Sequence, residues 1–122
     1  MSFDWAQYIV LAETLYRSAE TSAEREACLR SAISRAYYGA YGLAREVAAM
    51  GGAQLKGSYK DHGIVTAYFS NSSQPSYRQI SLELRRLRRA RNQADYDDLY
   101  QDLDRQTQIA LRRARYIERL LP

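Results

Sequence analysis

The chain has 122 residues, the length of one compact domain, and 46% of them are hydrophobic, which is typical of a globular protein and not of a disordered one. The net charge is +4, and arginine supplies almost all of the 18 basic residues. One cysteine, Cys28, and one histidine, His62, exclude a disulfide and a cysteine- or histidine-rich metal cluster within one chain, and no apolar run is long enough to span a membrane. We therefore expect a single cytoplasmic domain over residues 1–122, without a metal, a cofactor or a membrane contact.

The first predicted helix covers residues 2–19, with Ser2 placed to cap it. A capping-box pattern at residues 21–24 opens a long second helix, which runs to about Met50 and stops at a Gly-Gly pair. This helix carries two apolar stripes, so it is expected to contact several neighbours at the centre of the fold. Gly39 and Gly42 interrupt it at a cost in helix propensity, which indicates close approach of another helix or chain.

A loop is expected over residues 51–60, followed by a short helix over 61–70 and a breaker that ends at Pro75. Ser76 and Gln79 form another capping-box pattern, which opens a third main helix, and Asp97 or Asp98 is placed to cap a fourth. No strand pattern competes with these helices. The sequence thus predicts an all-α fold, an up-and-down antiparallel bundle of four main helices plus one short helix.

The third main helix is rich in arginine, with six in the fourteen residues 78–91. Arg85, Arg88 and Arg89 share a face by their spacing. Such a face can follow a phosphate backbone, because guanidinium groups bind phosphate oxygens in a planar, two-pronged geometry. It can equally be the solvated side of an amphipathic helix, and the sequence leaves both interpretations open.

Arg91 differs from the other arginines because it continues the apolar stripe of its helix, so it is predicted to point toward the core. A buried charge needs a partner, and Asp95 stands four residues later, at the spacing of a helical ion pair. Either the pair only pins the end of the helix, or Arg91 and its neighbours line a cleft. A second candidate lies in the long second helix, where Arg35 is close to Tyr38, a tyrosine that falls outside both apolar stripes.

Two segments in this order, Ser34-Arg35-Ala36-Tyr37-Tyr38 and Arg91-Asn92-Gln93-Ala94-Asp95-Tyr96-Asp97, resemble the HEPN domain family over nearly the whole chain. The segment that begins Asp61-His62-Gly63 is similar to the stretch between the long helices of some members. The resemblance implies a helical bundle that forms a homodimer. It also implies a metal-independent ribonuclease toxin, paired with a small nucleotidyltransferase (MNT-type) antitoxin.

The family's catalytic pattern, an arginine with a polar residue and then a histidine, maps onto Arg91 and Asn92, but no histidine follows. Asp95 and Tyr96 stand in that region instead, and the resemblance implies that these four residues form the catalytic site. Arg35, Tyr38, Arg85, Arg88, Arg89 and His62 are the candidate RNA- or nucleotide-binding residues.

The missing histidine leaves the function open. His62 can supply the imidazole from elsewhere in the fold, or it can be an ordinary polar surface residue in a turn. If no imidazole is supplied, the chain is a non-catalytic HEPN module that binds a nucleotide, an RNA or a nucleotidyltransferase. The third alternative is a structural bundle whose arginines only keep it in solution.

Overall fold

The computed structural model describes residues 2–122, and over these residues it contains helices and no strands. The helices are α1 (Ala6–Ala19), α2 (Arg25–Met50), α3 (Asp61–Ser70), α4 (Pro75–Tyr96) and α5 (Leu103–Leu120). The prediction of an all-α fold with four long helices and one short helix is confirmed. The positions of the two helix-free segments that flank α3 are also as expected.

The helix starts differ from the capping predictions. Ser2 does not cap α1, since the Ala6 N–H is bonded to the Asp4 carboxylate at 3.1 Å. Ser76 lies inside α4 and does not cap it, because the helix already begins at Pro75. Proline fits the first turn of a helix, where an N–H has no helical partner. The last helix begins only at Leu103, after a left-handed residue with a φ of 58° at position 102.

Arg30 of α2 explains why the chain turns away after α4 and forms no immediate new helix. Its guanidinium donates to the carbonyl oxygens of Ala94, Asp97 and Asp98 at 3.0, 2.5 and 3.0 Å. The last carbonyls of a helix have no partner within the helix, and an arginine can satisfy them. One side chain from α2 therefore fixes both the end of α4 and the first residues of the following loop.

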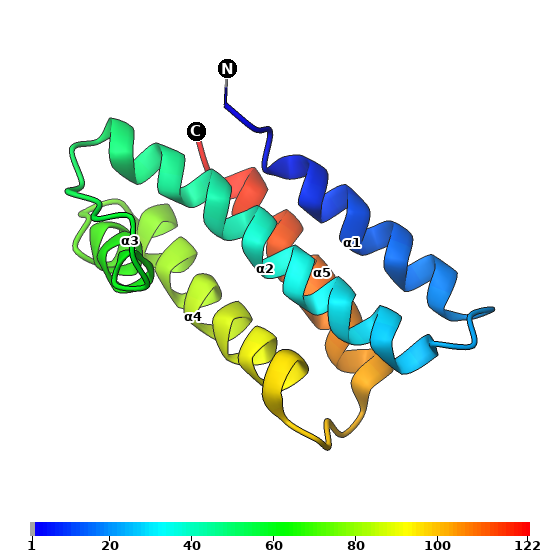
Figure 1. Ribbon diagram of the computed structural model, residues 1–122. Helices are drawn as coiled ribbons and strands as arrows, with labels where there is room; N and C mark the ends of the chain where they lie inside the picture. The colour runs from blue at the N-terminus through cyan, green and yellow to red at the C-terminus, as the bar shows by residue number, and fades with distance from the viewer. Residues whose placement is uncertain (1) are drawn as a thin grey trace.

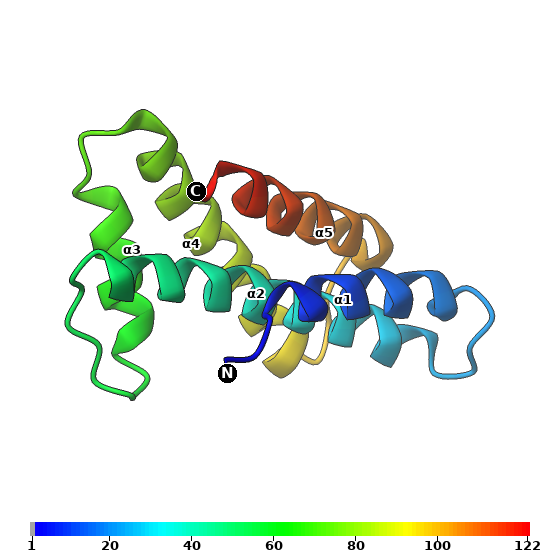
Figure 2. The ribbon, with the colours of Figure 1, turned by 90° about the horizontal axis from the view of Figure 1, so that it is seen from above.

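Helix α2 lies at the centre and contacts all four other helices. In Figure 1, α1 lies alongside α2, while α4 and α5 lie on its other sides and are joined by a loop at the lower right. The short α3 crosses the opposite end of the molecule, against α4 and α2, as Figure 2 shows from above. The buried side chains form one cluster to which all five helices contribute.

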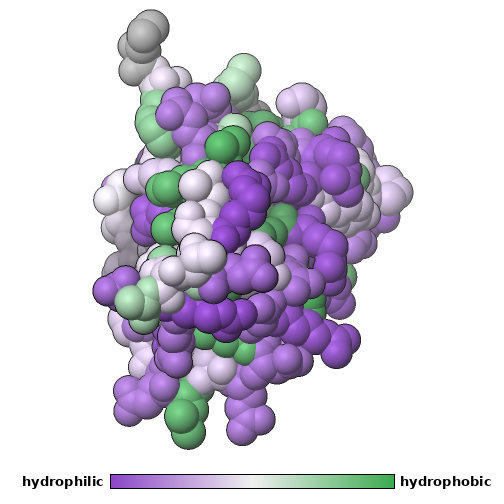
Figure 3. All heavy atoms as spheres, turned by 90° about the vertical axis from the view of Figure 1, so that its right-hand side faces the viewer, coloured by the Kyte–Doolittle hydropathy of each residue, from purple (hydrophilic) through white to green (hydrophobic). Residues whose placement is uncertain are grey.

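The close approach predicted from the two glycines is made by α1. A Cβ atom on Gly42 would overlap the Trp5 ring, and one on Gly39 would meet the Ile9 side chain. The glycines therefore let α1 come near the α2 backbone within the same chain. No helix in residues 2–122 has the length and apolar character that a membrane crossing requires. The face at the right of Figure 1 is mostly hydrophilic, with scattered hydrophobic side chains, as Figure 3 shows.

Candidate functional site

The site is built around Arg91, on the side of α4 that faces α2. Its side chain is only 16% exposed, which confirms the predicted inward orientation. The Nε atom of Arg91 lies 2.9 Å from the Asp95 carboxylate, so the predicted i,i+4 pair is present. The side-chain amide oxygen of Asn92 accepts a second bond from Arg91 at 2.9 Å, and the Ser34 hydroxyl donates to Asp95 at 3.3 Å. These bonds hold the guanidinium in one orientation.

Arginines and tyrosines from three segments alternate along this face. In order, the members are Tyr8, Arg35, Tyr38, Arg91 and Tyr96, and the distances from guanidinium carbon to ring centre are 4.8, 5.3, 5.0 and 5.5 Å. We call this row the arginine–tyrosine ladder. Cation–π contact occupies the flat faces of a guanidinium, whereas its N–H groups point outward in the plane and remain able to donate to an anion. Within residues 2–122, Arg35 forms no ion pair with a carboxylate, so its N–H groups are available.

His62 lies beside this row. It belongs to the first turn of α3 and is half-buried, so the interpretation as a polar surface residue in a turn is wrong. Its Nδ1 atom is 2.5 Å from the Tyr37 hydroxyl, and its ring is stacked on Tyr41 with centroids 4.4 Å apart. The Tyr37 ring in turn meets the Tyr38 ring at 5.3 Å, which connects the imidazole to the arginine–tyrosine ladder.

The local electrostatics keep the imidazole neutral near pH 7. Burial lowers the pKa of His62 below its usual 6.5, and the positive charges of Arg88 and Arg91 lower this pKa further, against the smaller opposing effect of Asp61. Burial raises the pKa of the Tyr37 hydroxyl, so this group remains protonated. A protonated hydroxyl can donate to Nδ1 or accept from Nδ1–H, so the same contact serves either tautomer of His62.

The three arginines predicted to share one face are separated by the structure. The Nε atom of Arg88 is buried and has no hydrogen-bond partner within residues 2–122, and its charge acts on Tyr37 and His62. Arg85 is exposed and donates to the Ser81 hydroxyl at 3.4 Å, whereas Arg89 lines a cavity toward α5. Only Arg88 therefore belongs to the site around Arg91.

Sequence reasoning missed several members of the site. The spacing of Tyr37 and Tyr41, four residues apart, predicts only that they share an apolar side of α2, and nothing in the sequence around Tyr8 indicates a site. The signal was the run of tyrosines beside Arg35, but its spacing does not reveal which ring meets His62. Asp61 was missed as well: its carboxylate accepts the backbone N–H groups of residues 56 and 57 at 2.7 and 2.9 Å. These two bonds fix the end of the loop between α2 and α3, and His62 follows directly in the first turn of α3.

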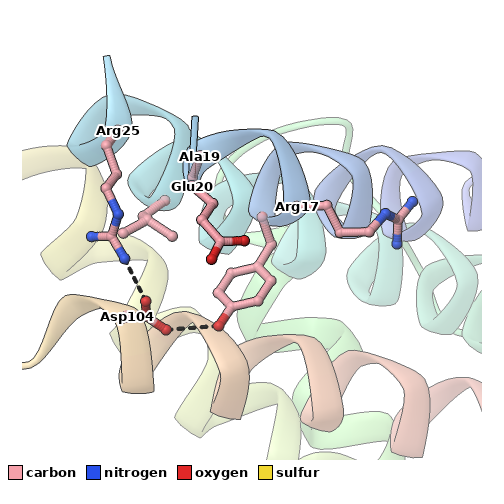
Figure 4. Close-up of a pocket in the computed structure, with 7 residues that line it drawn as sticks. Arg17, Ala19, Glu20, Arg25 and Asp104 are labelled. Atoms are coloured by element: carbon pink, nitrogen blue, oxygen red, sulfur yellow. Dashed lines mark hydrogen bonds and ion pairs between the residues drawn. The ribbon is translucent and has the colours of Figure 1, made fainter. Parts of the chain in front are cut away.

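A separate cavity of about 350 Å³ lies where the α1–α2 turn meets α5, and Figure 4 shows its lining. Asp104 accepts hydrogen bonds there from the Tyr16 hydroxyl at 2.7 Å and from Arg25 at 2.5 Å. The Arg17 guanidinium reaches the Thr14 hydroxyl at 3.4 Å. Asp104, Tyr16 and Arg25 thus satisfy one another, so they have less to offer a ligand than the groups around Arg91. In the described part of the chain, no cluster of three or more His, Cys, Asp or Glu side chains is placed to hold a metal ion.

Neither the models of protein families, nor the curated proteins, nor the solved structures compared with this chain give a match.

Proposed function

We propose that the protein is a HEPN-type domain that binds and cleaves RNA without a metal ion, with His62 as the imidazole that is missing after Arg91. One observation carries the proposal: the imidazole is bonded to Tyr37 and lies within the electrostatic influence of Arg88 and Arg91. In cleavage of RNA by its own 2′-hydroxyl, a neutral imidazole can accept the hydroxyl proton and a fixed guanidinium can stabilise the charge that develops on the phosphate.

The reaction proceeds by internal transfer at phosphorus. The neutral His62 accepts the proton of a 2′-hydroxyl, the 2′-oxygen attacks the adjacent phosphorus, and the bond from phosphorus to the 5′-oxygen breaks. The 5′-oxygen takes a proton from water, and His62 returns its proton to the solvent. Arg91 and Arg88 stabilise the negative charge that grows on the phosphate oxygens. The products are a 2′,3′-cyclic phosphate and a 5′-hydroxyl end.

The other residues that the HEPN resemblance identifies as site residues position Arg91 or bind the RNA in this proposal. Asp95 and Asn92 orient Arg91 through the hydrogen bonds described above, and the carboxylate is already engaged, so it is less suited than His62 to accept a proton. Tyr96 closes the arginine–tyrosine ladder, and Arg35 with Tyr38 binds the backbone of the RNA ahead of the scissile phosphate. Arg85 and Arg89 lie outside this site.

The remaining parts of the proposal concern assembly. The four long helices follow one another up and down as antiparallel neighbours, the arrangement that the sequence of four main helices and one short helix predicts. A second copy of the chain packs near the end of α4, where Leu99 and Tyr96 are 84% and 71% exposed. Apolar groups so exposed beside a charged site favour a protein contact. The pairing with a nucleotidyltransferase antitoxin rests on the HEPN resemblance.

The test is cleavage of a labelled RNA pool in EDTA by the wild type and by His62→Gln. We expect the wild type to produce 2′,3′-cyclic ends and His62→Gln to be slower by about 100-fold or more, the usual contribution of a general base. Arg105→Gln is the matched control, because Arg105 is exposed and has no ion pair among the described residues. Equal rates for His62→Gln and wild type would remove His62 from the mechanism.

The alternative is a non-catalytic module that binds RNA or a nucleotide, and the arginine–tyrosine ladder is the observation that favours it. Stacked rings with interleaved arginines bind single-stranded RNA without any need for a proton acceptor. RNA binding that weakens with salt, together with no cleavage by a folded wild type, would select this alternative. If a folded wild type neither bound nor cleaved RNA, the remaining alternative would be a structural bundle whose arginines only keep it in solution.

A further inference from the structure

Helix α4 presents a second group of arginines on its other side, toward α5. A cavity of about 250 Å³ lies there, and its polar lining consists of Arg86, Arg89, Gln93, Tyr100, Gln106 and Arg113. Arg86 and Arg89 come from successive turns of α4, and Arg113 comes from the facing helix α5. None of these residues contributes to the site around Arg91 and His62.

Two of the three arginines are held in place by one buried carboxylate. The Glu83 side chain is only 8% exposed, with one oxygen 2.9 Å from Arg86 and the other 3.2 Å from Arg113. Each of these guanidinium groups retains N–H groups that Glu83 does not use, since a guanidinium has five. Glu83 thus holds the guanidinium groups of Arg86 and Arg113 beside the cavity.

The charges at this cavity do not balance. Arg89 makes no hydrogen bond or ion pair with any residue from 2 to 122, so among the ion pairs of the three lining arginines the single carboxylate of Glu83 offsets one of three positive charges. Like charges brought together are unfavourable unless an anion lies between them. The neighbouring amides of Gln93 and Gln106 add neutral donors, so the cavity combines excess positive charge with directed hydrogen-bond donors.

We propose that this cavity binds a phosphate group, of a small phosphorylated ligand such as a nucleotide. Planar guanidinium groups from two helices can contact several oxygens of a tetrahedral anion at once. A carboxylate is planar and has two oxygens, so it would occupy fewer of these donors. The available volume accommodates a phosphate, and a nucleoside attached to it would extend beyond the arginines. The site is independent of RNA cleavage, because it lies on the other side of α4.

The test is calorimetric titration of the full chain with inorganic phosphate, AMP and adenosine, with thermal unfolding measured alongside. Arg89→Gln is the variant of choice, since Arg89 is exposed and forms no hydrogen bond or ion pair within residues 2–122. Arg113→Gln would instead remove one of the ion-pair partners of the buried Glu83 carboxylate. Arg105→Gln serves as the matched control on α5, because Arg105 is exposed and does not line the cavity. Potassium chloride at equal ionic strength shows the effect of screening alone.

Phosphate and AMP are expected to bind the wild type and Arg105→Gln, and to raise their unfolding temperatures in a concentration-dependent way. Arg89→Gln should bind both about tenfold or more weakly, which is the loss of one charge-assisted hydrogen bond. Adenosine should not bind, and RNA cleavage by Arg89→Gln should equal that of the wild type. Equal phosphate binding by Arg89→Gln, or the same response to potassium chloride, would overturn the proposal. So would an Arg89→Gln defect confined to long RNA, because the cavity would then be part of an RNA surface.

Discussion

Tyr37→Phe isolates the contact on which the proposed mechanism depends, the hydrogen bond between the Tyr37 hydroxyl and Nδ1 of His62 at 2.5 Å. The variant keeps the buried ring and removes one oxygen. A hydrogen bond between neutral groups contributes about 1 kcal/mol to the free energy of unfolding, and about 2 kcal/mol when its loss leaves a buried partner without a hydrogen bond. For a chain of this size, that corresponds to a fall of about 4–8 °C in the unfolding temperature.

The same substitution should slow RNA cleavage more than it weakens RNA binding, because an imidazole without its anchor adopts several orientations and only some of them reach the 2′-hydroxyl. We expect a loss of about tenfold in the rate of single-turnover cleavage, with the dissociation constant for RNA changed little. The assay is cleavage of a labelled RNA at saturating protein, beside filter binding of a non-cleavable 2′-deoxy analogue.

Tyr41→Phe is the matched control for Tyr37→Phe. The Tyr41 ring stacks on His62 at 4.4 Å, but its hydroxyl forms no hydrogen bond with the imidazole. Tyr41→Phe should therefore retain most of the cleavage rate. If the two variants lose the same activity, orientation of the imidazole by Tyr37 is not the reason for the loss, and the reasoning fails.

Two further predictions concern pH and salt. Because the pKa of His62 is lower in the folded chain than its unfolded value near 6.5, the unfolded chain binds the proton first, so the free energy of unfolding should fall as the pH drops through and below about 6.5. His62 is the only histidine, so its ring-proton NMR signal should titrate below pH 6.5, and His62→Gln should lack this part of the pH dependence; a midpoint above 6.5 would contradict the assignment. Arg35→Gln should reduce the slope of log K for RNA binding against log salt by about 1, as the loss of one phosphate contact requires, and an unchanged slope would remove Arg35 from the RNA path.

Much of the fold was predictable because the long helices bury continuous stripes, and burial of such stripes dominates helix stability in proteins. The inward position of Arg91 followed from the same periodicity, and its partner Asp95 followed from helix geometry. Helix starts were harder, since they depend on side chains from elsewhere. The delayed start of α5 depends on Arg30, which lies more than sixty positions before the carbonyls that it binds.

The composition of the site was only partly predictable for a related reason. The position of His62 depends on how α3 crosses α2 and α4, and although Val65 and Phe69 mark the buried side of α3, their spacing does not specify the angle of this crossing. The separation of Arg88 from Arg89 was missed because residues on successive positions of a helix point about 100° apart, so a shared face cannot be assumed. Packing decides which arginine acts on His62 through its charge and which lines the cavity against α5.

The proposed role of Arg91, to stabilise the charge on a scissile phosphate, is tested by the rate of RNA cleavage in EDTA by Arg91→Ala. The wild type and Arg105→Ala should cleave a labelled RNA pool, while Arg91→Ala should be slower by about 100-fold or more, the usual cost of removing one donor to a developing negative charge. Circular dichroism confirms that Arg91→Ala is folded before the rates are compared. Cleavage by Arg91→Ala at the wild-type rate, or no cleavage by a folded wild type, would contradict the claim.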